Sequence, residues 1–198
     1  MNRNAYVLLL LTTLMRGGNA VAGKLAVGHV SPMLLTSARW TFALIILVAI
    51  GWRQFRADWP LIKRNIPLLT GLGALGFPGF NIALYSALNY TTAINASIEQ
   101  AAMPMLIFAV NFLLFRLRVR AGQIIGFVLS IAGVALTASH GDPARLLDLD
   151  VNFGDALMVV AVIVYSLYTV GLRFKPAVQW QSLMIALTAA AAVTSFPF

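Results

Sequence analysis

Long apolar runs, each followed by a short polar break, recur along the whole of this 198-residue sequence. A helix that crosses the hydrocarbon core of a bilayer needs about 20 mostly apolar residues. No break between the runs is long enough to hold a separate soluble domain, so the expected fold is an all-α membrane protein, a multi-helix transmembrane bundle. The sequence predicts seven helical segments, at residues 6–27, 32–51, 66–88, 93–115, 123–138, 154–172 and 181–198.

Composition supports lipid as the solvent of this chain. Only 10% of the residues are charged and 60% are hydrophobic, whereas a soluble domain is about 25% charged. The absence of cysteine excludes disulfides, zinc-thiolate sites and a cysteine nucleophile. His29 and His140 have no other metal-ligating residues near them in the sequence. We therefore expect neither a metal ion nor a cofactor.

The net charge of +8 is explained by where the basic residues lie. They gather in alternate breaks, whereas the opposite breaks hold one arginine among three aspartates. Basic loops stay in the cytoplasm, which predicts an inner-membrane protein with a cytoplasmic N-terminus. No basic stripe is interleaved with exposed aromatics, so nucleic-acid binding is not expected. The first group is Arg53, Arg56, Lys63, Arg64, Arg116, Arg118, Arg120, Arg173 and Lys175, and the second is Asp142, Arg145, Asp148 and Asp150.

The third segment contains a glycine pattern with two readings. Gly71, Gly73 and Gly76 fit the dinucleotide-binding fingerprint, but that fingerprint needs a preceding strand and a βαβ unit. Here the glycines lie in an apolar helical run, where small residues let helices approach closely. Close helix packing is the expected role. Pro78 and Pro104 are expected to kink their helices and to free backbone carbonyls that can line a cavity.

Ionisable groups within the spans are the first functional candidates, because they are costly inside a membrane. Arg16, Lys24, Arg39 and Glu99 are the four clear cases. At a rise of about 1.5 Å per residue, the last three fall in a similar layer below the outer boundary. Asn81 belongs near that layer, and Arg16 lies near the middle of its helix.

Each charged candidate has a structural alternative. Glu99 could form an ion pair with Arg39 or Lys24 that ties helices together, or could serve a substrate or proton site in an aqueous cavity. Lys24 could instead extend to the outer surface. Arg16 has no evident acidic partner. A net positive cavity would favour a substrate that carries a carboxylate or another anionic group.

The order of several motifs resembles that of a known family. Gly17-Gly18-Asn19 is followed by Lys24, Pro32 and Arg39, a spacing similar to that of the EamA-type branch of the drug/metabolite transporter superfamily. The stretch 83–93, continuing to Pro104, resembles the family's hairpin of helices 3 and 4. The resemblance covers residues from about 5 to 175. Glu99 is not a position that the family motif supplies.

The resemblance implies ten helices in two inverted five-helix halves around a central cavity. Residues 1–138 would form the first five-helix repeat, and residues 151–198 would begin a second, incomplete one. About three helices of the family's fold would then lie outside this chain.

The resemblance to EamA-type transporters and the polar residues within the spans together predict secondary transport. The chain would export small metabolites such as amino acids or related compounds by alternating access around a midplane site. A non-transporting membrane scaffold or accessory subunit is the alternative, and a homodimer is left open. An intramembrane enzyme is not expected, because the spans lack a nucleophile–base pair. The candidate substrate-binding residues are Arg16, Asn19, Lys24, Arg39, Asn81 and Glu99.

Overall fold

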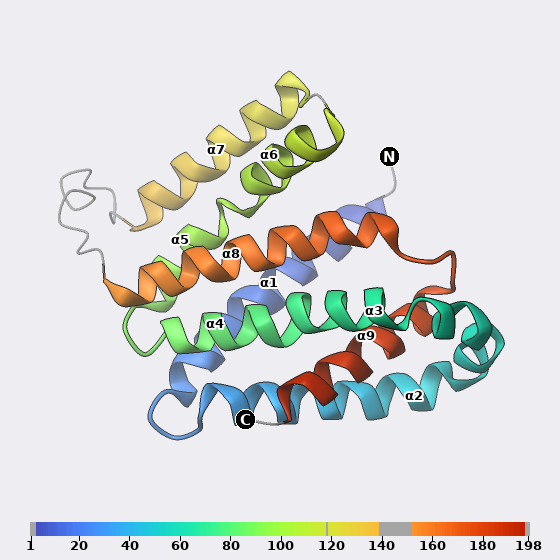
Figure 1. Ribbon diagram of the computed structural model, residues 1–198. Helices are drawn as coiled ribbons and strands as arrows, with labels where there is room; N and C mark the ends of the chain where they lie inside the picture. The colour runs from blue at the N-terminus through green and yellow to red at the C-terminus, as the bar shows by residue number, and fades with distance from the viewer. Residues whose placement is uncertain (1–2, 118, 139–151, 197–198) are drawn as a thin grey trace.

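The computed structural model describes residues 3–117, 119–138 and 152–196. All regular structure in these ranges is helical, and the helices lie side by side in a bundle (Figure 1). They group into seven segments, which confirms the predicted fold class. The elements are α1 (Arg3–Ala26), α2 (Pro32–Arg64), α3 (Ile66–Ala74), η1 (Leu75–Gly79), α4 (Phe80–Ala87), α5 (Ala93–Gln100), α6 (Met103–Phe115), α7 (Ala121–Ala138), α8 (Phe153–Gly171), η3 (Leu172–Phe174) and α9 (Trp180–Ser195).

Several residues used in the sequence analysis fall outside the described ranges, namely Arg118, His140, Asp142, Arg145, Asp148 and Asp150.

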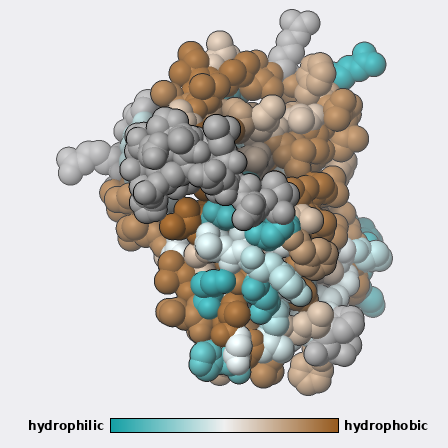
Figure 2. Space-filling model, turned by 90° about the vertical axis from the view of Figure 1, so that its left-hand side faces the viewer, coloured by the Kyte–Doolittle hydropathy of each residue, from teal (hydrophilic) through white to brown (hydrophobic). Residues whose placement is uncertain are grey.

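Within the described ranges, four helical segments are long and apolar enough to cross a membrane: Pro32–Arg64, Ile66–Ala87, Ala93–Phe115 and Phe153–Phe174. Large hydrophobic side chains are exposed along the bundle, as lipid-facing residues would be. Figure 2 views the molecule from the end where α4 finishes and α8 begins. Hydrophobic residues dominate its margins, and hydrophilic residues gather in a patch in the lower half. This arrangement suits a bundle whose sides face lipid and whose ends face water.

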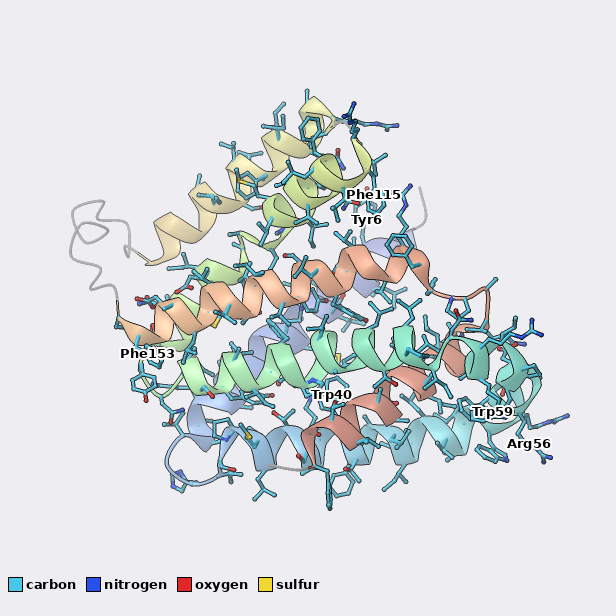
Figure 3. The ribbon with its side chains drawn as sticks, viewed as in Figure 1. Tyr6, Trp40, Arg56, Trp59, Phe115 and Phe153 are labelled. Atoms are coloured by element: carbon cyan, nitrogen blue, oxygen red, sulfur yellow. The ribbon has the colours of Figure 1, made fainter. Side chains whose placement is uncertain are left out.

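The second helix is longer than the sequence analysis predicted. Instead of ending at Gly51, α2 continues to Arg64 and contains Pro60. The added stretch contains arginine, glutamine, alanine and lysine, which favour helix, so the helix persists beyond its most apolar part. The prediction of a basic loop was therefore wrong for Arg53 through Arg64, which lie on a helix. Figure 3 shows Arg56 and Trp59 at this end of the bundle and Phe153 at the other.

The continuous segment α3–η1–α4 forms the centre of the bundle, because it packs against α8 and also against α9. One buried cluster joins α4, α5, α6 and α8 around Leu84, Leu88 and Met158. A second joins α2, α3, α8 and α9 around Leu72 and Leu187. The segment therefore holds both halves of the described core together.

Glycines permit the closest contacts of this central segment. A Cβ on Gly73 would lie 2.6 Å from the carbonyl oxygen of Leu187 in α9. A Cβ on Gly76 would lie 2.4 Å from the ring of Tyr168 in α8. Both distances are shorter than any normal contact, so only glycine fits. The predicted role of this glycine pattern in close helix packing is confirmed at these two positions.

Both prolines interrupt their helices as expected. Pro78 lies within η1, a π-helical turn between α3 and α4. Pro104 lies in the first turn of α6, directly after the break that separates α6 from α5. Proline cannot donate a backbone hydrogen bond and clashes with the preceding turn. The turn at η1 brings Gly76 and Phe77 to the wall of the pocket described next.

Candidate functional site

A pocket of about 250 Å³ lies among α1, α2, η1, α4, α5 and α8. We call it the arginine pocket, because its polar lining includes two guanidinium groups. Its polar residues are Thr12, Arg16, Asn19, Arg39, Asn81 and Gln100. Its aromatic residues are Trp40, Phe77, Phe80, Tyr165 and Tyr168, and Met15 and Gly76 complete the wall.

Arg39 organises one side of the pocket. Its Nη1 donates to Oδ1 of Asn19 at 2.6 Å, to Oδ1 of Asn81 at 3.2 Å and to the Tyr85 hydroxyl at 2.8 Å. The Tyr85 hydroxyl in turn donates to Oδ1 of Asn19 at 2.8 Å. Tyr85 is only 3% exposed, so this network is anchored in the core. It joins α1, α2 and α4 and fixes where the guanidinium lies.

The orientation of Asn81 follows from the π-helical turn. Its Nδ2 donates to the carbonyl oxygen of Phe77 at 2.8 Å, which leaves Oδ1 to accept from Arg39. Asn81 is buried, and a buried amide without partners would be costly. The turn therefore determines which end of the amide meets the arginine.

Arg16 has a different environment from Arg39. Its guanidinium lies over the Tyr165 ring, 5.0 Å from the centroid. Within the described part of the chain it has no hydrogen-bond acceptor and no ion-pair partner. Cation–π attraction holds its position while its N–H donors remain free for water or a ligand.

Aromatic rings form a continuous wall around the two arginines. The Trp40 ring centroid lies 4.4 Å from that of Phe77, which is 5.6 Å from that of Tyr168. Tyr165 lies 5.7 Å from Tyr168 and 5.1 Å from Phe80. Figure 3 places Trp40 between α2 and α4. The Nε1 of Trp40 is buried and has no hydrogen-bond partner in the part of the chain that the structure describes.

The arginine pocket carries a formal charge of two positive units, because none of its lining residues is acidic. The structure brings together four of the six predicted site residues: Arg16, Asn19, Arg39 and Asn81. The similar depth predicted for Arg39 and Asn81 thus corresponds to a direct hydrogen bond.

Lys24 lies outside this pocket. Its Nζ donates to the carbonyl oxygens of Leu88 and Thr91, at 2.6 and 2.8 Å. These carbonyls follow the end of α4, where a helix leaves acceptors without internal partners. Lys24 therefore ties α1 to the end of α4.

Glu99 also lies apart from the arginines. It lines a separate, largely apolar cavity of about 390 Å³ between α5, α6 and α8. Its carboxyl group lies within hydrogen-bond reach of that of Asp155 in α8, and its Oε2 is buried with no hydrogen-bond partner among the described residues. The Asp155 carboxylate accepts from Thr91 Oγ1 and from the backbone of Asn152. The alternative of an ion pair with Arg39 or Lys24 does not occur among the described residues.

The sequence analysis missed most of the aromatic wall. Trp40 follows Arg39 directly in the sequence, and Tyr165 and Tyr168 are three residues apart, which places them on one helix face. These spacings were available signals. Phe77 and Phe80 had no distinguishing signal within an apolar run, since their place depends on the π-helical turn.

Comparison with known proteins points to membrane transport. The model of the EamA-like transporter family matches residues 3–139. Uncharacterized transporter YyaM of Bacillus subtilis (strain 168) is 26% identical over 175 residues, which cover 86% of this chain and 56% of that protein. Uncharacterized transporter YetK of the same organism is 28% identical over 165 residues, covering 83% of this chain and 50% of that protein.

An uncharacterized transporter of Archaeoglobus fulgidus is 30% identical over 179 residues, covering 86% of this chain and 57% of that protein. The chain thus spans about half the length of the curated relatives it matches. No solved structure matches it.

Proposed function

This chain belongs to the EamA-like transporter family, and from that premise we propose that it acts as a secondary transporter that exports small metabolites such as amino acids or related compounds. The observation that carries this proposal is the arginine pocket. Four of the predicted site residues, from three helices, converge in a cavity within the bundle. Charged and amide side chains within the helices of an otherwise apolar membrane protein are costly, which makes a ligand-binding role the default hypothesis for them.

Each of the six predicted site residues would have its own role in transport. Arg16 and Arg39 would supply positive potential for an anionic group. Asn19 and Asn81 would hold Arg39 and contribute hydrogen bonds. Lys24 would act from α1 by holding the end of α4, and Glu99 would act as a proton carrier or counter-ion away from the two guanidinium groups.

Alternating access would move the two repeats, residues 1–138 and 151–198, against each other. The site in such transporters lies between the repeats. The arginine pocket fits this scheme, because Tyr165 and Tyr168 of α8 face Arg16, Trp40 and Phe77 of the first repeat. A rocking motion would open the contact between these side chains.

We propose that the protein lies in the inner membrane with its N-terminus in the cytoplasm. The ends of α2, α6 and α8 and the start of α9 lie at one end of the bundle (Figure 1). Arg56, Arg64, Arg116 and Arg173 belong to that end. A cysteine introduced at either end, labelled with a membrane-impermeant reagent in intact cells, would test this.

Flux in reconstituted vesicles tests the function itself. We expect saturable efflux of small carboxylate-bearing metabolites, with Arg16→Gln and Arg39→Gln each reducing the rate. Equal transport by both variants would exclude a role for the positive pocket. If the folded wild-type protein gives no saturable flux, the transporter proposal fails and the scaffold alternative is favoured.

A further inference from the structure

We infer that the arginine pocket selects organic monocarboxylates that have an apolar, planar body and lack an ammonium group. This inference rests on the proposed transport function and revises its substrate class, because it replaces the amino acids named there by related carboxylates without an ammonium group. It separates simple carboxylates from amino acids, which carry the same carboxylate beside a cationic group. Charge, hydrogen-bond capacity and the aromatic wall each support it.

The charge of the pocket disfavours an ammonium group. Arg16 and Arg39 both line it, and no acidic side chain does. Glu99, the candidate counter-charge, lines a different cavity and lies beside Asp155. A zwitterion would gain attraction at its carboxylate and meet repulsion at its ammonium group, and both effects strengthen where the dielectric is low.

Hydrogen-bond capacity in the pocket is unequal. The two asparagine acceptors are already engaged, since Oδ1 of Asn19 and Oδ1 of Asn81 both accept from Arg39. Gln100, whose Nε2 donates to the carbonyl oxygen of Ala96, adds one amide oxygen as an acceptor. Donors, in contrast, are in excess. Arg16 has no acceptor among the described residues, Arg39 uses only Nη1, and Nε1 of Trp40 is buried without a partner. A carboxylate has acceptor sites only and complements this surplus.

The aromatic wall provides the apolar contact, and guanidinium groups already occupy two of its five rings. An aromatic face could bind an ammonium group, but the guanidinium of Arg16 lies over Tyr165 and that of Arg39 lies over Trp40, at 5.0 and 5.2 Å. Phe77 and Phe80 remain to contact the body of the ligand. The volume of about 250 Å³ restricts the ligand to one small ring or a short chain.

Three ligands with the same phenylethyl skeleton separate these effects. 3-Phenylpropionate carries the carboxylate alone, phenylalanine adds the ammonium group, and phenethylamine carries the ammonium group alone. Binding to the protein in lipid nanodiscs would be measured by calorimetry and by Trp40 fluorescence. Trp52→Phe, Trp59→Phe and Trp180→Phe together leave Trp40 as the single tryptophan reporter.

We expect 3-phenylpropionate to bind at least tenfold more tightly than phenylalanine, and phenethylamine not to bind. Arg16→Gln should weaken 3-phenylpropionate binding roughly 10- to 100-fold, the value of one or two charge-assisted hydrogen bonds. Arg173→Gln is the matched control. Arg173 also lies over an aromatic ring, 4.6 Å from the centroid of Phe115, but it does not line the pocket, so this variant should bind as the wild type does.

Phenylalanine binding as tight as that of 3-phenylpropionate would overturn the inference, as would the absence of 3-phenylpropionate binding to protein that elutes as a folded monodisperse species. Arg16→Lys guards against a folding defect in the glutamine variant, since it keeps the charge and should keep most of the selectivity. Failure of the proposed function would give a different result. In that case 3-phenylpropionate would bind with the expected selectivity, but reconstituted vesicles would show no flux.

Discussion

Arg39 donates a 2.6 Å hydrogen bond from Nη1 to Oδ1 of Asn19, and this contact joins α2 to α1 at the edge of the arginine pocket. The same Asn19 oxygen accepts from the Tyr85 hydroxyl. Asn19 thus holds the guanidinium without neutralising it. The pocket keeps the full positive charge of Arg39 for a ligand.

Changing Asn19→Asp would convert that neutral contact into an ion pair. The carboxylate has nearly the shape of the amide, so the geometry should persist and the attraction should raise Tm. The pocket would lose half its net positive charge, and we expect affinity for a carboxylate ligand to fall about tenfold, equivalent to about 1.4 kcal/mol. Thermal unfolding in detergent and vesicle flux would measure the two effects.

Asn111→Asp is the control for this change. Among the described residues, Asn111 forms one side-chain hydrogen bond, which it donates to the carbonyl oxygen of Ile107 in its own helix. A carboxylate there should lower Tm with no specific effect on ligand affinity. A lower Tm for Asn19→Asp, or unchanged affinity, would contradict the role assigned to Asn19.

Gly76→Ala should damage the pocket, because the added Cβ would lie 2.4 Å from the Tyr168 ring. The ring would have to move from the aromatic wall, and overpacking of this kind costs about 1–3 kcal/mol. We expect reduced stability and weaker ligand binding. Gly71→Ala lies in the same segment with nothing within 4 Å and should be neutral or stabilising by about 0.4–1 kcal/mol. Similar behaviour of the two variants would refute the packing argument.

Prediction of the site from the sequence needs two quantities for each residue: its depth in the membrane and its direction around the helix axis. Depth in the membrane follows from counting residues along a helix, and that count correctly brought Arg39 and Asn81 together. Direction around the helix axis is a separate matter, because each residue turns by about 100°. Gln100 therefore lines the arginine pocket, whereas its neighbour Glu99 faces α8.

The fold was predictable for a related reason. Apolar runs of spanning length are a strong local signal, so all seven segments were found. The extension of α2 past Gly51 was missed because hydropathy marks where lipid ends, whereas helix propensity and capping decide where a helix ends. The π-helical turn at η1 depends on the packing of α3 against its neighbours, and its proline alone indicated only a kink.

Lys24→Met should separate stability from binding. Lys24 donates to two carbonyl oxygens beyond the end of α4, and methionine keeps the chain length while removing both bonds. We expect a loss of about 1–3 kcal/mol in unfolding free energy with ligand affinity unchanged. Arg16→Gln should do the opposite, since Arg16 has no hydrogen-bond partner in the described residues. Equal affinity losses in both variants would place Lys24 in the binding site after all.

Glu99 and Asp155 place two carboxyl groups side by side, from α5 and from the first turn of α8. Adjacent carboxylates repel each other, and a proton between them removes that repulsion. Among the described residues, Thr91 links this pair to Lys24, because its Oγ1 donates to Asp155 and its carbonyl oxygen accepts from Lys24. The proton-carrier role proposed for Glu99 can therefore be tested at this pair.

If Glu99 carries the coupled proton, Glu99→Gln should abolish flux driven by a pH gradient. Exchange of labelled for unlabelled substrate without a gradient should continue, because the arginine pocket is untouched. Vesicle flux with and without an imposed pH gradient would measure both. Asp58→Asn is the control, since that carboxylate accepts from the backbone of Gln179 at the opposite end of the bundle. Gradient-driven flux that survives in Glu99→Gln would show that the pair is structural.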